Sequence, residues 1–239
     1  MSTLFPGLWP VLPLFPACDI KVTQPPGTLS PEIQTEASHI WAKACEARPE
    51  LFNGCVFSAD HVSRTCITGH WTEYRLVLAQ MKNPSLFSKL KLNPLAVTGL
   101  LRTPQGYVLG RRHPSSVYQG NFWQSPPAGS IEKREASDAV NLKEQLLAEA
   151  EEELGLPPDS IEVSSPRLIV RHPGTRILDV CLYMTTHLTF DAVETCWKQS
   201  GNTEYDQLIL LTDQHIAQWA KRPDLLPTSK ALLNCRPVL

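Results

Sequence analysis

The sequence has no excess of charge of either sign. Its 239 residues include 22 lysines and arginines and 24 aspartates and glutamates, which gives a net charge of -2. Proteins that bind nucleic acid need a basic surface against the phosphates, so this balance argues against a nucleic-acid partner. Hydrophobic residues make up 42% of the chain and charged residues 19%, which is the composition of a globular protein with a sizeable core.

The sequence also lacks an apolar run long enough to cross a membrane. The first twenty residues are apolar, but they have no basic segment and contain four prolines, Pro6, Pro10, Pro13 and Pro16. Proline at this density prevents a helix. We therefore expect an extended segment on the domain surface, neither a signal peptide nor a membrane anchor, and no membrane partner.

Paired cysteine motifs are missing as well. The seven cysteines form an odd, scattered set without CxxC spacing, which fits reduced thiols and the cytoplasm better than a disulfide framework or a zinc site. The seven histidines share no ligand spacing, which also argues against zinc. His172, beside Arg171, is expected to be a surface or packed histidine rather than a phosphate contact.

The N-terminal part of the chain predicts a small α+β region. Ser30-Pro31-Glu32 is a helix start, and Pro49 limits the helix, so we expect a helix over residues 31–47. Residues 55–63 and 66–80 are rich in strand-forming residues, and the region ends near Lys91. A boundary near Asn93-Pro94 divides the chain into an N-terminal extension, 1–92, and a second domain, 93–239.

The second domain begins with a predicted hairpin over residues 95–112, turning at Pro104-Gln105-Gly106. The loop that follows carries Tyr118, Phe122 and Trp123, which either contact a ligand or plug the end of a sheet. We expect strands at 160–171, 176–190 and 205–211, and helices at 213–221 and 228–234. Between the loop and these strands lies a helix over 138–154, whose core-facing stripe is Ala139, Leu146, Leu147, Ala150 and Leu154.

Three carboxylates lie beside this stripe. Glu149, Glu152 and Glu153 have the i, i+3, i+4 spacing that places them on one side of a helix. Carboxylates within one turn disfavour each other's ionisation unless a cation neutralises them, and oxygen ligands suit Mg²⁺. A solvated acidic surface is the alternative. The glycine turn ending at Gly129, the nearby Glu132 and the strands on both sides favour a metal site.

The segment from Gly129 to Leu156 resembles the Nudix box, which reads glycine, five residues, glutamate, seven residues, then Arg-Glu-apolar-x-Glu-Glu-x-Gly-apolar. Its final part matches at Glu149, Ala150, Glu152, Glu153, Gly155 and Leu156. The segment departs from the pattern in one residue and in one spacing. Ala148 stands where the box has arginine, and it follows Gly129 by nineteen residues (148 − 129) where the box has fourteen. The insertion falls in the loop at 133–141.

The resemblance implies a Nudix α/β/α sandwich with a mixed sheet, preceded by a small N-terminal α+β domain. It also implies an enzyme that hydrolyses a small-molecule nucleoside diphosphate substrate with Mg²⁺, or Mn²⁺ as a substitute, and works as a monomer or homodimer. Glu149, Glu152 and Glu153 would hold the metal. A box without its arginine, after an N-terminal extension, looks like the UDP-glucose pyrophosphatase branch, which converts UDP-glucose to UMP and glucose 1-phosphate.

The same resemblance assigns residues to the diphosphate. Of the pair Arg111-Arg112, Arg112 matches a diphosphate- or nucleotide-binding arginine, with a strand-end surface charge as the alternative. Ser130 and Glu132 match positions that contact substrate and metal. Glu204 lies in a loop where many Nudix enzymes keep the catalytic base, and a solvated loop acid is the alternative.

Further residues are assigned to the nucleotide. Phe52 and Tyr74 match an aromatic pair that packs on the base, although Phe52 also fits a core position. Thr228 corresponds to a hydroxyl near the last helix. Two other functions stay open: a Nudix hydrolase of ADP-ribose, another sugar nucleotide or a CoA ester, and a catalytically silent module that binds a nucleotide or protein, for which Ala148 is the best argument.

Overall fold

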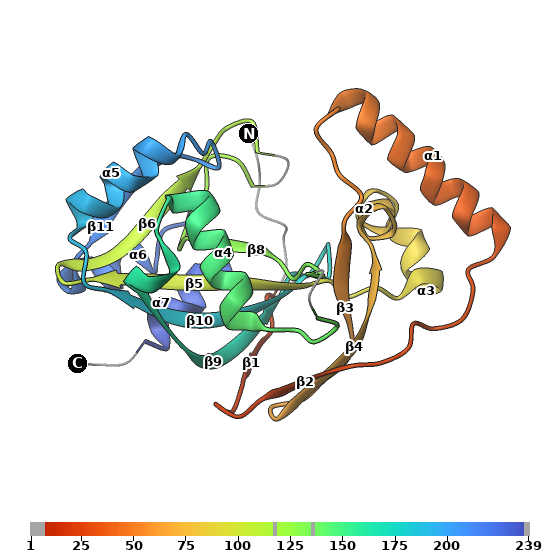
Figure 1. The fold of residues 1–239 in the computed structure, drawn as a ribbon, viewed down its shortest axis with the longest axis horizontal. Helices are drawn as coiled ribbons and strands as arrows, with labels where there is room; N and C mark the ends of the chain where they lie inside the picture. The colour runs from red at the N-terminus through yellow and green to blue at the C-terminus, as the bar shows by residue number, and fades with distance from the viewer. Residues whose placement is uncertain (1–7, 117–118, 135–136, 237–239) are drawn as a thin grey trace.

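A computed structural model describes residues 8–116, 119–134 and 137–236 (Figure 1). Most strands form one mixed sheet in the order β1-β9-β10-β5-β6-β11, with β7 against β6 and β8 against β5. β10 is parallel to β5, and the other pairs are antiparallel. The strands of this large sheet are β1 (Val11–Pro13), β5 (Leu95–Thr103), β6 (Gly106–Arg112), β7 (Trp123–Gln124), β8 (Ala128–Ser130), β9 (Ile161–Arg171), β10 (Leu178–Thr186) and β11 (Tyr205–Leu211).

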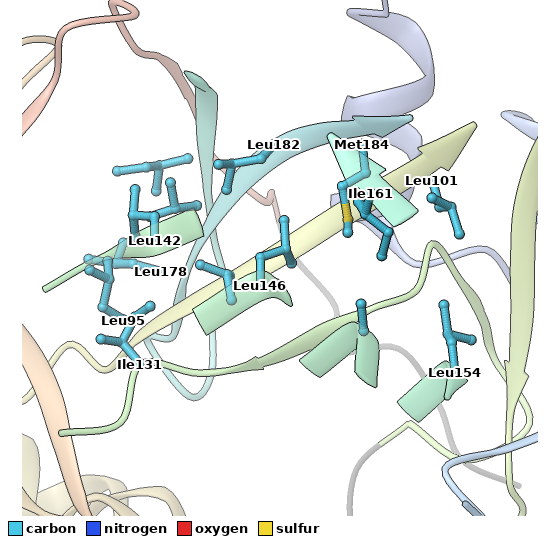
Figure 2. Close-up of a cluster of buried hydrophobic side chains, with 14 of the residues drawn as sticks. Leu95, Leu101, Ile131, Leu142, Leu146, Leu154, Ile161, Leu178, Leu182 and Met184 are labelled. Carbon is cyan, nitrogen blue, oxygen red and sulfur yellow. The ribbon is translucent and has the colours of Figure 1, made fainter. Parts of the chain in front are cut away.

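Helices cover both faces of the large sheet. On one face lie α4 (Leu142–Leu154) and α5 (Phe190–Ser200), and Figure 2 shows Leu142, Leu146 and Leu154 of α4 packed over the strands. On the other face lie α6 (Ile216–Trp219) and α7 (Pro227–Asn234), whose Ile216, Leu232 and Leu233 form a second core cluster. The fold is therefore a mixed α/β fold with an α/β/α sandwich, as the sequence predicts.

The N-terminal region forms a smaller layer beside the sandwich (Figure 1). Its three-stranded sheet has the order β2-β4-β3. Its elements are β2 (Asp19–Val22), α1 (Pro31–Ala47), β3 (Cys55–Val62), β4 (Cys66–Glu73), α2 (Tyr74–Lys82) and α3 (Phe87–Leu90). The Phe57 amide donates to the Ile131 carbonyl at 2.9 Å, and Phe57 shares a core cluster with α4. The hydrophobic core thus continues across residue 93, while β1 belongs to the large sheet; the division into 1–92 and 93–239 remains a prediction.

Several predicted elements are confirmed. The helix over 31–47 and the strand over 205–211 have the expected bounds, and the hairpin over 95–112 forms β5 and β6. Among the described residues at the N-terminus, 11–13 and 19–22 are extended, as the prolines predict; Pro6 lies outside the described residues. Gly155 ends α4 with a left-handed φ of 65°.

Three element predictions are wrong. Residues 74–80, expected to continue a strand, form α2, because a continuous buried run from Leu76 to Gln80 does not distinguish strand from helix. The helix expected from 138 begins at Leu142, since the Asn141 side chain accepts from the Lys143 and Glu144 amides, and Ala139 is exposed outside it. The strand expected over 176–190 ends at Thr186, and the unpredicted helix α5 begins at Phe190.

Two expectations drawn from missing motifs concern the whole molecule. All seven cysteines are free. Across the described ranges, none of the helices has the length and apolar character needed to span a bilayer.

His172 is a packed histidine, one of the two alternatives that the sequence favours. It is 1% exposed, its ring packs edge-on against Trp9 with ring centroids 4.3 Å apart, and its Nδ1 accepts a hydrogen bond from the Thr175 amide at 2.8 Å.

Candidate functional site

The three predicted carboxylates of α4 lie in different environments. Glu153 is 5% exposed and accepts hydrogen bonds from the Tyr205 hydroxyl at 2.8 Å and the Ala128 amide at 3.2 Å. Burial raises the pKa of Glu153 well above its usual range. Glu149 is half-buried and accepts from Gln145 Nε2 at 2.7 Å, while Glu152 is exposed. One side chain of the three therefore points into the protein interior.

The absence of a side chain at Gly129 leaves room for the side chain of Glu149. β8 carries Gly129 opposite Val97 of β5, directly under α4. A Cβ at residue 129 would overlap the Glu149 carboxylate. The glycine that precedes the helix in sequence thus leaves the space that the first carboxylate occupies, so the Gly129–Glu149 relation in the sequence is a physical contact.

An acidic cavity of about 400 Å³ lies over this contact. Three acids, Glu132, Glu149 and Glu152, line it together with Ala148 and two bases, Lys133 and Arg134. Burial raises the pKa of Glu149 to about 7 against the opposing Gln145 hydrogen bond, and the charges of Glu152 and Glu132 raise it further. Burial also raises the pKa of Glu132, followed by the charge of Glu152. The charge of Arg134 lowers the pKa of both carboxyls, but burial and the neighbouring acids outweigh it, so the cavity gathers carboxylates that repel one another.

The chemistry of these donors fits a hard divalent cation, although they do not form a ready-made cage. Within residues 8–116, 119–134 and 137–236, no three histidine, cysteine or acidic side chains are gathered closely enough to hold a metal. The all-oxygen donor set and the mutual repulsion of the carboxylates nevertheless suit Mg²⁺ or Mn²⁺. Glu132, Glu149 and Glu152 face the acidic cavity, whereas Glu153 has hydrogen-bond partners in the interior.

A chain of hydrogen bonds links Glu153 to Arg112 at the end of β6. Tyr205 donates to Glu153 and accepts from Gln124 Nε2 at 2.5 Å. Gln124 Oε1 in turn accepts from Arg112 Nη1 at 3.1 Å, and Arg112 forms an ion pair of 2.7 Å with Glu204. Three predicted site residues, Glu153, Arg112 and Glu204, are thereby connected through Gln124 and Tyr205, which sequence reasoning missed.

A second cavity, which we call the α2 cavity, has a volume of about 300 Å³ and lies between α2 and the large sheet. Its polar wall includes Asp179, whose Oδ2 accepts from the Thr228 hydroxyl at 3.0 Å. Burial raises the pKa of Asp179 to about 6, against the lowering effects of Thr228, Thr98 and Arg112. Apolar side chains of α2, β5 and the loop before α7 form much of its lining: Val77, Leu78, Leu95, Ala96 and Leu226. Four predicted site residues also line it: Tyr74, Arg112, Ser130 and Thr228.

The two cavities adjoin at β8, because Gly129 and Ser130 line both. One cavity is acidic and the other largely apolar, with Arg112 in the wall of the apolar one. A ligand that crosses Gly129 and Ser130 would therefore place one part beside the carboxylates and another part among apolar side chains.

Phe52 and Arg111 lie away from this junction. Phe52 is 81% exposed, so the alternative of a core position is wrong, and it lies in the wall of neither cavity. Tyr74 lines the α2 cavity and packs edge-on against Trp41, with ring centroids 6.2 Å apart. The structure thus does not place Phe52 with Tyr74 around one ligand space. Arg111 forms an ion pair with Asp206 at 2.7 Å and lines neither cavity, so of the predicted pair Arg111-Arg112 it is Arg112 that lines a cavity.

The aromatic loop residues plug the sheet end where they are described. Phe122 and Trp123 are buried, and Trp123 packs edge-on against Trp219 at 5.3 Å. Tyr118 lies outside the described residues, as do residues 135–136 of the predicted insertion loop.

No protein-family model and no curated protein matches the sequence. Solved structures with a similar fold include DR0079 from Deinococcus radiodurans, with 18% identity and a TM-score of 0.44, covering 59% of this chain and 81% of that one. Another is the Nudix hydrolase RenU from M. smegmatis, with 19% identity, a TM-score of 0.42 and coverages of 62% and 89%. A third is a bifunctional NMN adenylyltransferase/ADP-ribose pyrophosphatase from Francisella tularensis, complexed with AMP and a Mn ion, with 13% identity, a TM-score of 0.43 and coverages of 67% and 45%. We therefore base the proposed function on the side chains of this chain.

Proposed function

We propose that this chain is a Nudix-type pyrophosphatase that uses Mg²⁺, or Mn²⁺ in its place, to hydrolyse UDP-glucose to UMP and glucose 1-phosphate. The observation that supports this proposal is the junction of the acidic cavity and the α2 cavity at Gly129 and Ser130. A nucleoside diphosphate sugar has a matching division, with an uncharged heterocycle at one end and a diphosphate that needs positive charge further along.

Glu149 and Glu152 would hold the cation, with Glu132 facing the same cavity in the place that sequence reasoning gave to Glu153. A bound divalent cation supplies positive charge that neutralises the diphosphate and favours attack by water. Glu152 is exposed, so it serves either as a further ligand or as a base for that water. Glu153, held by Tyr205 and Ala128, fixes the position of β8 relative to α4.

Arg112 would stabilise charge on the diphosphate as it develops. Its guanidinium is held between Glu204 and Gln124 at the wall of the α2 cavity. Glu204 is engaged by this arginine, so we assign it the positioning of Arg112 rather than the role of catalytic base. Ser130, which lines both cavities, would contact the substrate where it crosses β8.

The test is to incubate the protein with UDP-glucose and Mg²⁺ and to measure UMP and glucose 1-phosphate. ADP-ribose, a second sugar nucleotide and a CoA ester serve as rival substrates, and Glu149→Gln serves as the inactive control. We expect the highest kcat/KM with UDP-glucose and no product without a divalent cation. A higher kcat/KM with a rival would reassign the substrate.

A catalytically silent module is the second candidate. It is favoured by Ala148, which lines the acidic cavity where the Nudix box has an arginine. Thermal stabilisation by UDP-glucose, with no product from any diphosphate at any metal concentration, would support this candidate and exclude the hydrolase.

A further inference from the structure

Gln119 carries a buried hydrogen-bond donor in the wall of the α2 cavity. The residue is 6% exposed, and its Nε2 has no hydrogen-bond partner among the residues that the structure describes. A buried amide left without an acceptor is costly, and native proteins rarely keep one without a reason. The cavity beside Gln119 is where a ligand could supply the missing acceptor.

The backbone fixes Gln119 at this place. Gln119 has a φ of 53°, a left-handed conformation that is uncommon for residues other than glycine. The Phe122 amide donates to the Gln119 carbonyl at 3.3 Å, and the Asn121 amide donates to the Arg112 carbonyl at 3.0 Å. The turn is therefore tied to the end of β6, beside the arginine of the site.

Asp179 provides the complementary group in the same cavity. It lies on β10, and its Oδ2 already accepts from Thr228. A carboxylate has room for several hydrogen bonds and, when ionised, only accepts them. The α2 cavity thus presents an unpaired amide donor from Gln119 and an acceptor from Asp179. A ligand that satisfies both must offer an acceptor and an N–H or O–H donor.

The surroundings favour a flat heterocycle as that ligand. Val77 and Leu78 of α2 and Leu95 of β5 line the same cavity, and apolar walls suit a base better than a free sugar. We propose that Gln119 and Asp179 bind the hydrogen-bonding edge of the nucleobase, with Gln119 Nε2 donating to a base carbonyl and the adjacent base N–H donating to Asp179. This inference rests on the proposed function, in which the base is uracil.

Binding can be measured separately from hydrolysis by titrating the full-length protein with three probes in a calorimeter. The probes are UMP, 3-methyluridine 5′-monophosphate, which lacks the base N–H, and ribose 5-phosphate, which lacks the base. We expect the wild-type protein to bind UMP about tenfold more tightly than the N-methylated nucleotide, the effect of one well-made hydrogen bond.

The protein side is tested with Gln119→Met, which keeps the length of the side chain and removes the amide. We expect about tenfold weaker UMP binding and an unchanged affinity for ribose 5-phosphate. Gln218→Met, at an exposed position on α6, is the matched control and should bind UMP as the wild type does. In Asp179→Leu the penalty for N-methylation should disappear; if that variant does not fold, the comparison of UMP with its N-methylated form still tests the base N–H.

Equal affinity of the wild type for UMP and 3-methyluridine 5′-monophosphate would overturn the inference, as would wild-type UMP binding by Gln119→Met. Loss of ribose 5-phosphate binding in Gln119→Met would also overturn it, because the contact would then lie outside the base. Hydrolysis of UDP-glucose is assayed separately. Hydrolysis without Gln119-dependent binding removes this inference alone, and Gln119-dependent binding without hydrolysis removes the proposed function alone.

Discussion

The Tyr205 hydroxyl donates a 2.8 Å hydrogen bond to Glu153 Oε2, and this contact joins β11 to α4 across the interior of the molecule. Both side chains are buried. Burial raises the pKa of both groups well above their usual ranges, so each resists ionisation in this environment. The pair connects the carboxylate helix with the strand that follows Glu204.

Tyr205→Phe removes this donor and leaves Glu153 with the Ala128 amide. We expect the free energy of unfolding to fall by roughly 1–3 kcal/mol, the usual cost of a buried polar group that loses a partner. Urea denaturation measures it. A double-mutant cycle with Glu153→Gln isolates the contact, and a coupling energy near zero would show that the two side chains act independently.

Gly129→Ala tests the fit between β8 and Glu149. The added Cβ would overlap the Glu149 carboxylate, so that side chain must move away from the acidic cavity. We expect hydrolysis of UDP-glucose to fall by about a factor of ten or more, since small displacements of catalytic groups have large effects. Gly27→Ala is the control, because nothing lies within 4 Å of its added Cβ. Equal activity of the two variants would remove Glu149 from the site.

Glu149→Gln and Glu153→Gln separate the two environments on α4. Loss of the Glu149 charge in the acidic cavity should reduce kcat by about 100-fold or more and leave the melting temperature nearly unchanged. Because Glu153 has interior partners, we expect Glu153→Gln to change the melting temperature as well. Turnover at the wild-type level in Glu149→Gln would contradict its assignment as a metal ligand, and the same result in Glu153→Gln would show that the interior contacts of Glu153 are not needed for turnover.

The packed His172 predicts a loss of stability in acid. Burial lowers its pKa to about 4 in the folded protein, whereas in the unfolded chain it takes up a proton near its ordinary value of 6.5. The unfolded state therefore binds more protons between these values, and stability falls as the pH drops from about 6.5 to about 4.

The contribution of His172 to the pH dependence of stability must be measured as a difference between the wild type and a His172 variant, because Asp179 has the opposite effect. Its pKa is raised from 3.8 to about 6, so the folded state binds more protons than the unfolded state over that range. We expect the wild type to lose stability relative to His172→Gln between pH 7 and pH 4.5, as measured by chemical denaturation. Parallel stability curves would show that His172 is not buried in the neutral form.

The sequence predicts those parts of the site whose residues are close along the chain. Glu149, Glu152 and Gly155 follow from helix spacing and capping, and Gly129 follows from its place before the helix. The sequence also predicts that Glu153 shares a side of the helix with Glu149, but not that Tyr205, 52 residues away, would bind it in the interior. The spacing of residues along one helix predicts which side of the helix a side chain lies on. It does not predict where Tyr205 lies, because that position depends on how the strands of the sheet are arranged.

Long-range contacts explain the other omissions. Gln119 and Gln124 belong to a stretch whose polar residues have no periodic pattern, although Gln124 forms part of the short strand β7, and Asp179 lies in a strand that is otherwise largely apolar. Their common location around the α2 cavity depends on β5, β6 and β10 lying side by side.

The hydrogen bond from Phe57 to Ile131 and the shared core beneath it join the N-terminal layer to the folded body that carries α4. Removing them would uncover the apolar surface against which Phe57, Ala59 and Ile67 pack and would take away the α2 wall of the cavity. On the proposed function, we therefore expect a shortened chain starting at residue 93 to lose solubility and ligand selectivity together. On the same proposal, we expect mutations in the N-terminal layer to change the choice of substrate, although Glu132, Glu149 and Glu152 all lie in the other part of the chain.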